Sequence, residues 1–139
     1  MCLCVDTKKH FNGKPKIADT DILVYKMLTL NDEGEIVTPY QRYLIIFDEN
    51  GTFTYSKVRL KKIGNSEITK GIHSFLSEIG AWLLRYHEFD RSIHYAIIPK
   101  GSRSFIGGVG AIVSNNLIVF ENKEVYKKYK STHKVTIIK

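Results

Sequence analysis

The strongest periodic signal in the chain is residues 21–30, DILVYKMLTL. With a period of two, one face carries Ile22, Val24, Lys26, Leu28 and Leu30, and the other carries Leu23, Tyr25 and Met27. A strand that is apolar on both faces is typical of a position inside a sheet, because both faces must be covered. The pattern therefore predicts a central strand, ended by the turn at residues 31–34.

A second pair of patterned segments, residues 43–47 and 52–60, predicts an antiparallel hairpin. The connection between them contains Asn50-Gly51, which tolerates the positive φ that tight hairpin turns require. Residues 61–70 are polar and contain Gly64, so they predict a loop.

Two stretches have helical spacing. In the first, Ser77 is an N-cap candidate with Glu78 in the first turn, and the helix is expected to end at Asp90. Its apolar positions follow the i, i+3, i+4, i+7 rule at Ile79, Trp82, Leu83 and Tyr86. The second is residues 121–130, where acidic residues come first and lysines last, as the helix dipole favours.

The rest of the chain predicts short strands. These are residues 93–98, 111–120 and 135–138, with a glycine-rich connection at 105–110. The total is about six strands and two helices, with strands often adjacent in sequence, which predicts an α+β fold with a largely antiparallel sheet. Residues 1–20 have no periodicity and are expected to form an extended arm, followed by one domain over residues 21–139.

Composition narrows the class of protein. The chain has 139 residues and is 43% hydrophobic, enough for the core of one domain. No window approaches the roughly 18 consecutive apolar residues of a membrane span, and the first residues do not resemble a signal peptide. Cys2 and Cys4 are too close together to staple the fold, and free thiols fit a reducing compartment. A cytoplasmic location is therefore expected, with no membrane partner.

Charge is the most uneven property of the chain. Lysine and arginine number 21 against 14 acids, a net charge of +7. One basic stretch is Lys57, Arg59, Lys61 and Lys62, and a second includes Lys127, Lys128 and Lys130. Such charge attracts acidic partners, although a solvated surface that keeps the protein soluble has the same composition. No zinc-finger, helix-turn-helix or RNA-recognition signature accompanies these lysines.

Few side chains suggest chemistry. Lys26 interrupts an apolar face, which is costly unless its amine meets an anion or a cleft, or reaches solvent along its stem. His73 and Ser74 lie between a short segment and a helix, but no acid or Gly-x-Ser-x-Gly elbow accompanies them. A role in capping or packing is the favoured interpretation of this histidine, because no third member of a triad is present.

Phosphate and metal motifs are not indicated either. The glycines at 107, 108 and 110 match neither phosphate-loop pattern, so a turn with positive φ is the simpler explanation. Cys2, Cys4 and His10 provide too few ligands for a structural zinc site. No metal and no resident cofactor are therefore expected.

Several short motifs suggest a family resemblance. Asp21-Ile22-x-x-Tyr25-Lys26, Gly71-Ile72-His73-Ser74-Phe75 and Ile98-Pro99-Lys100-Gly101-Ser102 occur in this order, after a Met-Cys-Leu start. This arrangement resembles a group of small proteins of bacteriophages and of bacteria such as the Bacteroidota. The resemblance implies an accessory protein of a phage or mobile element.

A more distant similarity is to the ADP-ribosyltransferase superfamily. Lys26 stands where that superfamily has an arginine, His73-Ser74-Phe75 where it has a Ser-Thr-Ser strand, and Asn116 near its catalytic glutamate. The segment between Asp90 and Glu121 contains no acid. This resemblance implies a degenerate ADP-ribosyltransferase-like fold, with Lys26, His73, Ser74 and Asn116 as candidate catalytic residues and NAD as the ligand.

Three functions are consistent with these observations. The first is a non-enzymatic accessory protein that binds a host protein or another acidic macromolecule through its basic residues, with inhibition of a host defence system as one such role. The second is a divergent ADP-ribosyltransferase-like enzyme or a binder of an NAD-derived nucleotide. The third is a weak, non-specific nucleic-acid binder.

Overall fold

A computed structural model describes residues 3–5, 14–38, 43–64, 67–78, 81, 92–107 and 110–138. Its strands, in chain order, are β1 (Leu3–Cys4), β2 (Lys16–Ile17), β3 (Asp21–Leu30), β4 (Ile36–Val37), β5 (Thr52–Tyr55), β6 (Lys61–Ile63), β7 (Glu67–Lys70), β8 (Ile72–Phe75), β9 (Ser92–Ile98), β10 (Arg103–Ile106), β11 (Ala111–Ser114), β12 (Leu117–Phe120) and β13 (Val135–Thr136). Helix α2 (Lys123–Lys130) follows β12. None of the helices in these ranges is long and apolar enough to cross a membrane.

Most strands belong to one sheet of ten strands. Its main path runs β2-β10-β11-β8-β3-β9-β12-β5, with β4 and β13 also paired to β3, and a separate small sheet has the order β1-β7-β6. All of these ladders are antiparallel except β13 on β3. The expected α+β fold with two helices is therefore wrong, because the described residues are predominantly β and α2 is their one short helix.

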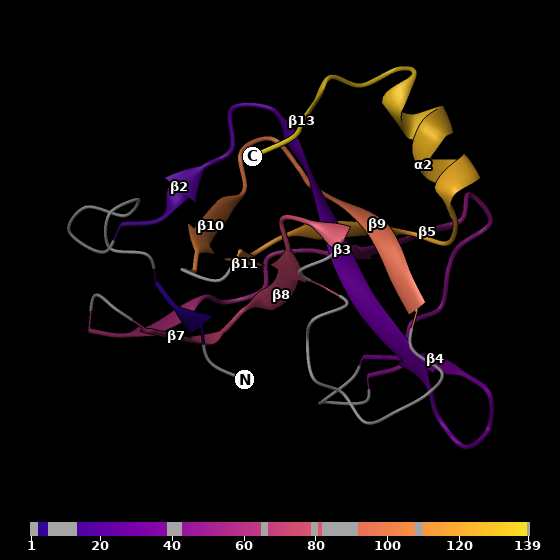
Figure 1. Cartoon of the computed structure of the whole chain (residues 1–139), viewed down its shortest axis with the longest axis horizontal. Coiled ribbons are helices and arrows are strands. Elements are labelled where there is room, and N and C mark those ends of the chain that lie inside the picture. Colours follow the sequence, from indigo (N-terminus) through magenta and orange to yellow (C-terminus); the bar gives the residue numbers. More distant parts are fainter. Residues whose placement is uncertain are drawn as a thin grey trace.

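The β3 strand occupies the predicted central position and runs through the middle of the sheet (Figure 1). It pairs with β9 over seven residues, from Ile22 to Leu28. Its other edge pairs in turn with β13, β8 and β4. Both faces are covered, since Val24 and Leu28 belong to one buried cluster and Leu23 to another.

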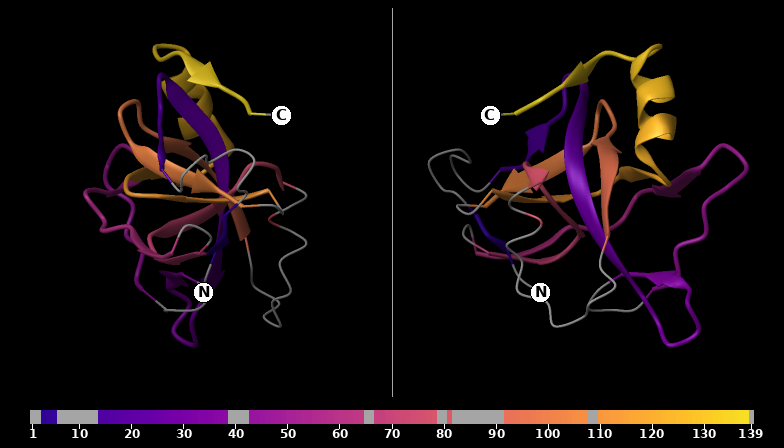
Figure 2. Two further views of the ribbon diagram at one scale, coloured as in Figure 1. Left: turned by 90° about the vertical axis from the view of Figure 1, so that its left-hand side faces the viewer. Right: turned by 45° about the vertical axis from the view of Figure 1, so that its right-hand side comes forward.

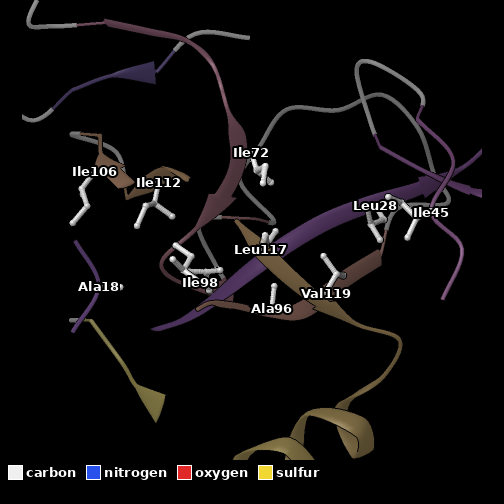
Figure 3. Close-up of a cluster of buried hydrophobic side chains, with 11 residues drawn as sticks. Ala18, Leu28, Ile45, Ile72, Ala96, Ile98, Ile106, Ile112, Leu117 and Val119 are labelled. Atoms are coloured by element: carbon white, nitrogen blue, oxygen red, sulfur yellow. The ribbon is translucent and has the colours of Figure 1, made fainter. Parts of the chain in front are cut away.

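The main core lies on the Val24 face. Side chains from β3, β8, β9, β11 and β12 meet there (Figure 3). Its members with no exposed surface are Val24, Leu28, Ala96, Ile98, Ile112, Leu117 and Val119. Because successive residues of a strand point to opposite faces, Leu23 and Ile97 lie on the other side, where Tyr126 of α2 covers them.

Helix α2 forms where the charge pattern predicts it, two residues later than expected. Asn122 is its N-cap, and its side chain accepts a hydrogen bond from the Val125 amide. Figure 2 shows α2 and β13 together at one end of the molecule, away from β4. Of the other predicted helix, Ser77, Glu78 and Ala81 are described, and the Ala81 amide donates to the Ser77 carbonyl over 3.2 Å. The remainder lies outside the described residues.

Two other local predictions are wrong. The turn at residues 48–51 exists, but the segments on either side of it do not pair with each other. Instead, β5 pairs with β12, and Leu44 bridges to Val37 of β4. The predicted loop at residues 61–70 contains the β6–β7 hairpin. The hairpin prediction fails because β5 pairs with a strand that is distant in sequence. The loop prediction fails because β6 and β7 are too short for a periodic pattern to be detected.

The N-terminal and glycine-rich segments also contribute strands. In the expected arm, β1 pairs with β7 and β2 pairs with β10. The glycine-rich connection includes part of a β10–β11 hairpin. Gly110 there has φ of 78°, the positive value expected of a turn glycine.

Candidate functional site

Three polar side chains form a row across the core face of the main sheet. Lys26 on β3 is directly opposite His94 on β9. On the other edge of β3, Tyr25 is opposite Phe75 of β8, and this antiparallel register places Ser74 opposite Lys26. Ser74, Lys26 and His94 are thus neighbours on adjacent strands, on the same face as Val24 and Ala96.

Lys26 is buried in this row and does not reach solvent along its stem. Its side chain is 8% exposed. The ammonium Nζ donates a hydrogen bond to the carbonyl oxygen of His73 over 2.8 Å. Burial lowers the pKa of the Lys26 amine to about 8, because the charged form loses its hydration. No carboxylate among the described residues forms an ion pair with it.

Ser74 and His73 occupy opposite faces of β8. Ser74 pairs with Ile112 and is 1% exposed, and its hydroxyl has no hydrogen-bond partner among the described residues. His73 pairs with Val113, and its buried Nε2 atom also has no partner there. Burial, followed by the positive charge of Lys26, lowers the pKa of His73 to about 4. His73 is therefore neutral near pH 7 and cannot serve as a charged group there.

His94 is a polar core residue that motif searching does not find. Its Nδ1 atom is 2.9 Å from the carbonyl oxygen of Phe120, and its Nε2 atom is 2.9 Å from the Ser92 hydroxyl. Since a carbonyl can only accept, Nδ1 carries the proton and the Ser92 hydroxyl donates to Nε2. Burial lowers the pKa of His94, and its ring stacks on Phe47. The signal that could have found it is alternation, which puts His94 on the same face as Ala96 in β9.

A hollow of about 400 Å³ lies beside His94. Its walls come from the ends of β9 and β12, the start of α2 and one further residue: Glu78, Ser92, Ile93, His94, Tyr95, Glu121, Asn122 and Lys123. Lys26 and Ser74 do not line it. The hollow is mixed in charge and does not connect the sequence candidates to one another.

Asn116 does not join the other candidates. It lies in the turn between β11 and β12, where its side-chain oxygen accepts from the Lys57 amide over 2.8 Å. Its side-chain nitrogen donates to Ser102 Oγ and to Asn115 Oδ1. The residue of this segment that faces Ser74 across the ladder is Ile112. Asn116 therefore fixes a turn, and the structure brings together Lys26, Ser74 and the backbone carbonyl of His73 without it.

No family model, no curated protein and no solved structure matches this chain. The assignment of a function therefore depends on the described side chains themselves.

The basic residues separate into two groups. Lys127, Lys128 and Lys130 lie exposed on α2. The other group lies beyond the end of β5 that is distant from α2. The start of β5 is near α2, because Thr52 pairs with Phe120, whereas its end, Tyr55, pairs with Leu117. The exposed residues that follow this end are Lys57, Arg59, Lys61 and Lys62. The two groups do not form one continuous face.

The group beyond β5 is extended by two cations that the sequence did not indicate. Lys70 is the register partner of Lys61 in the β6–β7 hairpin, which has a bulge between Lys61 and Lys62. Arg103 lies at the turn that also holds Lys57: Asn115 Oδ1 accepts from the Arg103 amide over 2.9 Å, and Asn116 Oδ1 accepts from the Lys57 amide. We call Lys57, Arg59, Lys61, Lys70 and Arg103 the basic surface. All five are exposed, and none has an ion pair among the described residues.

Metal ligands are not gathered anywhere in the described ranges. No group of three or more His, Cys, Asp or Glu side chains there is arranged to hold a metal ion. Cys2 and His10 lie outside those ranges, so the structure does not place the N-terminal set.

Proposed function

We propose that the protein acts without catalysis, as a binding protein that docks an acidic macromolecule on the basic surface. The observation that carries the proposal is the Lys61–Lys70 pair. These two exposed lysines are register partners at the end of the β6–β7 ladder, beside a bulge between Lys61 and Lys62. Like charges on paired residues destabilise a ladder, and an anion bound between them would relieve their repulsion. Neither lysine has a carboxylate partner among the described residues.

Backbone strain at the same surface supports the proposal. Lys57 has φ of 54°, the only positive value at a non-glycine residue in the described chain. A lysine in this conformation costs roughly 1–2 kcal/mol, and such strain is more frequent where a side chain must be presented in a fixed place. The hydrogen bond from the Lys57 amide to Asn116 holds the turn and keeps Lys57 near Arg103.

The resemblance to phage and Bacteroidota accessory proteins makes a host protein with an acidic patch the preferred partner. Inhibition of a host defence system is one role of such a protein. Direct binding of nucleic acid through the same cations is a weaker alternative, since no base-reading motif accompanies them.

A charge-matched pair of variants tests the basic surface. We expect Lys57→Gln/Arg59→Gln/Lys61→Gln to weaken binding to polyglutamate by about tenfold or more in low salt, because steering and contact both depend on these charges. Lys127→Gln/Lys128→Gln/Lys130→Gln removes the same charge from α2 and should change the affinity much less. Fluorescence anisotropy with labelled polyglutamate measures both.

Equal losses in the two triple variants would show that only net charge matters, and the proposal would be wrong. Repeating the titration with duplex DNA separates the partners. Affinity that falls steeply with salt for DNA, and is tighter than for polyglutamate, would favour the nucleic-acid alternative.

The placement of Ser74 opposite Lys26 across β8 and β3 supports a second candidate function. A buried cation without a carboxylate, beside a serine hydroxyl without a partner, fits a small anionic ligand such as the phosphate of an NAD-derived nucleotide. This arrangement corresponds to the ADP-ribosyltransferase-like alternative. The chemistry that this alternative needs is incomplete, because Ile112 rather than a carboxylate faces Ser74.

We accordingly expect no nicotinamide release when the protein is incubated with NAD. Transfer of ADP-ribose requires a group that stabilises the developing positive charge, and loss of one such group costs about a hundred- to a thousandfold in rate. Chromatographic detection of nicotinamide, with Lys26→Ala, His73→Ala and Asn116→Ala beside the parent, measures this. Turnover that Lys26→Ala abolishes would promote the enzyme. Turnover equal in all four proteins would indicate a contaminating activity.

A further inference from the structure

The segment from Tyr43 to Phe47 forms an open edge next to β4. The Thr38 amide donates to the Tyr43 carbonyl, and the Ile45 amide donates to the Ile36 carbonyl, both over 2.9 Å. These two bonds flank the Val37–Leu44 bridge. In an antiparallel ladder, a residue flanked in this way directs its own amide and carbonyl away from the neighbouring strand. Leu44 therefore presents free backbone groups outward, and no hydrogen bond is recorded for them among the described residues.

Large apolar side chains accompany this edge. Tyr43 is 59% exposed, Leu44 44% and Ile46 68%. Ile45 between them is buried in the main core, which fixes the segment against β4. Proteins usually protect an exposed edge with charge, proline or a bulge. The described part of this edge has apolar side chains instead, which favours the addition of another strand.

The described residues around the edge carry a charge opposite to that of the molecule as a whole, and Arg42, just before Tyr43, lies outside them. Described residues 28–38 and 43–56 contain no lysine or arginine, although the chain carries a net +7. The acids of these ranges are Asp32, Glu33, Glu35, Asp48 and Glu49, all of them exposed. The register of the Val37–Leu44 bridge places Glu35 opposite Ile46. The pKa of Glu33 is raised, first by its hydrogen bond with Glu35 and then by the charge of Glu35. These carboxylates lack basic neighbours in the described ranges, and a cationic partner would relieve their repulsion.

We propose that the Tyr43–Phe47 edge binds an extended segment of another protein, in which apolar residues alternate with lysine or arginine. The segment adds as a strand along Leu44 and Ile46, its apolar side chains cover these two residues, and its cations meet Glu35 and Glu49. This surface lies in a different part of the chain from the basic surface and takes a partner of opposite charge, so it does not depend on the proposed function above.

A short peptide of alternating lysine and valine is a suitable probe, with a glutamate–valine peptide as its control. We expect the lysine peptide to shift the amide resonances of Leu44 and Ile46 in low salt, and the glutamate peptide to leave them in place. Leu44→Lys/Ile46→Lys should lower the affinity for the lysine peptide by about tenfold, because the added lysines repel the cationic peptide and remove apolar contacts. Both residues are exposed, so the fold should persist, and the unchanged remainder of the spectrum checks this.

Two further variants sharpen the test. Ile137→Lys adds a cation at another exposed isoleucine, 54% exposed, and should leave the affinity of the lysine peptide nearly unchanged. Glu35→Gln/Glu49→Gln keeps the apolar edge intact and should weaken binding of that peptide roughly threefold, since exposed charges contribute a few tenths to 1 kcal/mol each.

Three results would overturn the proposal. The first is no shift at Leu44 and Ile46 with the lysine peptide at low salt. The second is the same affinity for the parent and for Leu44→Lys/Ile46→Lys. The third is a peptide-free dimer in sedimentation measurements that Leu44→Lys/Ile46→Lys dissociates, because a second copy of the chain would then occupy the edge.

Discussion

Gly71→Ala is expected to destabilise the protein by about 3 kcal/mol, which combines backbone strain with overpacking. Gly71 joins β7 to β8 with φ of 149°, a value that residues with a side chain rarely adopt. A Cβ atom there would overlap the Val113 side chain and lie 2.7 Å from the Leu60 Cδ2 atom. Thermal unfolding should report a loss of about 10 °C for a domain of this size.

The matched control is Gly101→Ala. Gly101 also has positive φ, 87°, but nothing lies within 4 Å of an added Cβ. Only the backbone strain remains in this variant, so we expect Gly101→Ala to lose about 1 kcal/mol of stability. If the two variants lose equal stability, Leu60 and Val113 are not packed on Gly71 as described. The consequence for function is direct, because Leu60 anchors the chain between Arg59 and Lys61, and a displaced Leu60 should also weaken polyglutamate binding.

The sequence predicts elements whose signal is local. The β3 strand is ten residues long and apolar on both faces, so its centre and its bounds follow from alternation alone. Helix α2 follows from its acid-first, lysine-last order, and the structure adds Asn122 as its cap. Elements of two to four residues, such as β6 and β7, bury too little for a periodic pattern, and distant partners stabilise them.

Long-range pairing also explains the failed hairpin. Asn50-Gly51 does mark a turn, and the Gly51 amide donates to the Asp48 carbonyl. A turn signal does not say whether the flanking segments pair with each other. Here β5 pairs with β12, and Val119 and Phe120 of that ladder are fully buried. The β5–β12 ladder joins segments more than 60 residues apart in sequence. Local propensity carries no information about such a pairing, so it could not predict that this ladder replaces the local hairpin.

Part of the candidate site was predictable, because it too has a local signal in the sequence. Lys26 was evident because it interrupts an apolar period, and Ser74 follows once β8 is adjacent to β3. Asn116 lies apart from these two, because the chain turns there and Ile112 faces Ser74 instead. The acidic edge was missed, since residues 31–35 and 48–49 are separate in sequence and were treated only as turns.

The second large effect concerns Lys26 and pH. The folded-state pKa of Lys26 is lowered from 10.5 to about 8 by burial, so above pH 8 the unfolded chain holds a proton that the native state has released. Stability therefore rises with pH between about 8 and 10.5. Tyrosines of the unfolded chain begin to ionise near pH 10. The pH range in which the change in stability reports on Lys26 alone therefore ends below pH 10. We expect a gain of about 2 kcal/mol from about pH 7 to about pH 9.5, measured by urea unfolding.

Lys26→Met separates this residue from every other titrating group. Methionine fills similar space without charge, so the variant should be about as stable as the parent or more stable near pH 7, and its stability should change less with pH. Lys16→Met, at an exposed lysine, should keep the pH dependence of the parent. Removing the Lys26 charge should also raise the pKa of His73 above about 4, which proton NMR of the imidazole detects. Parent and Lys26→Met curves with the same slope would show that the Lys26 amine is hydrated in the native state, and the buried row of Ser74, Lys26 and His94 would then be wrong.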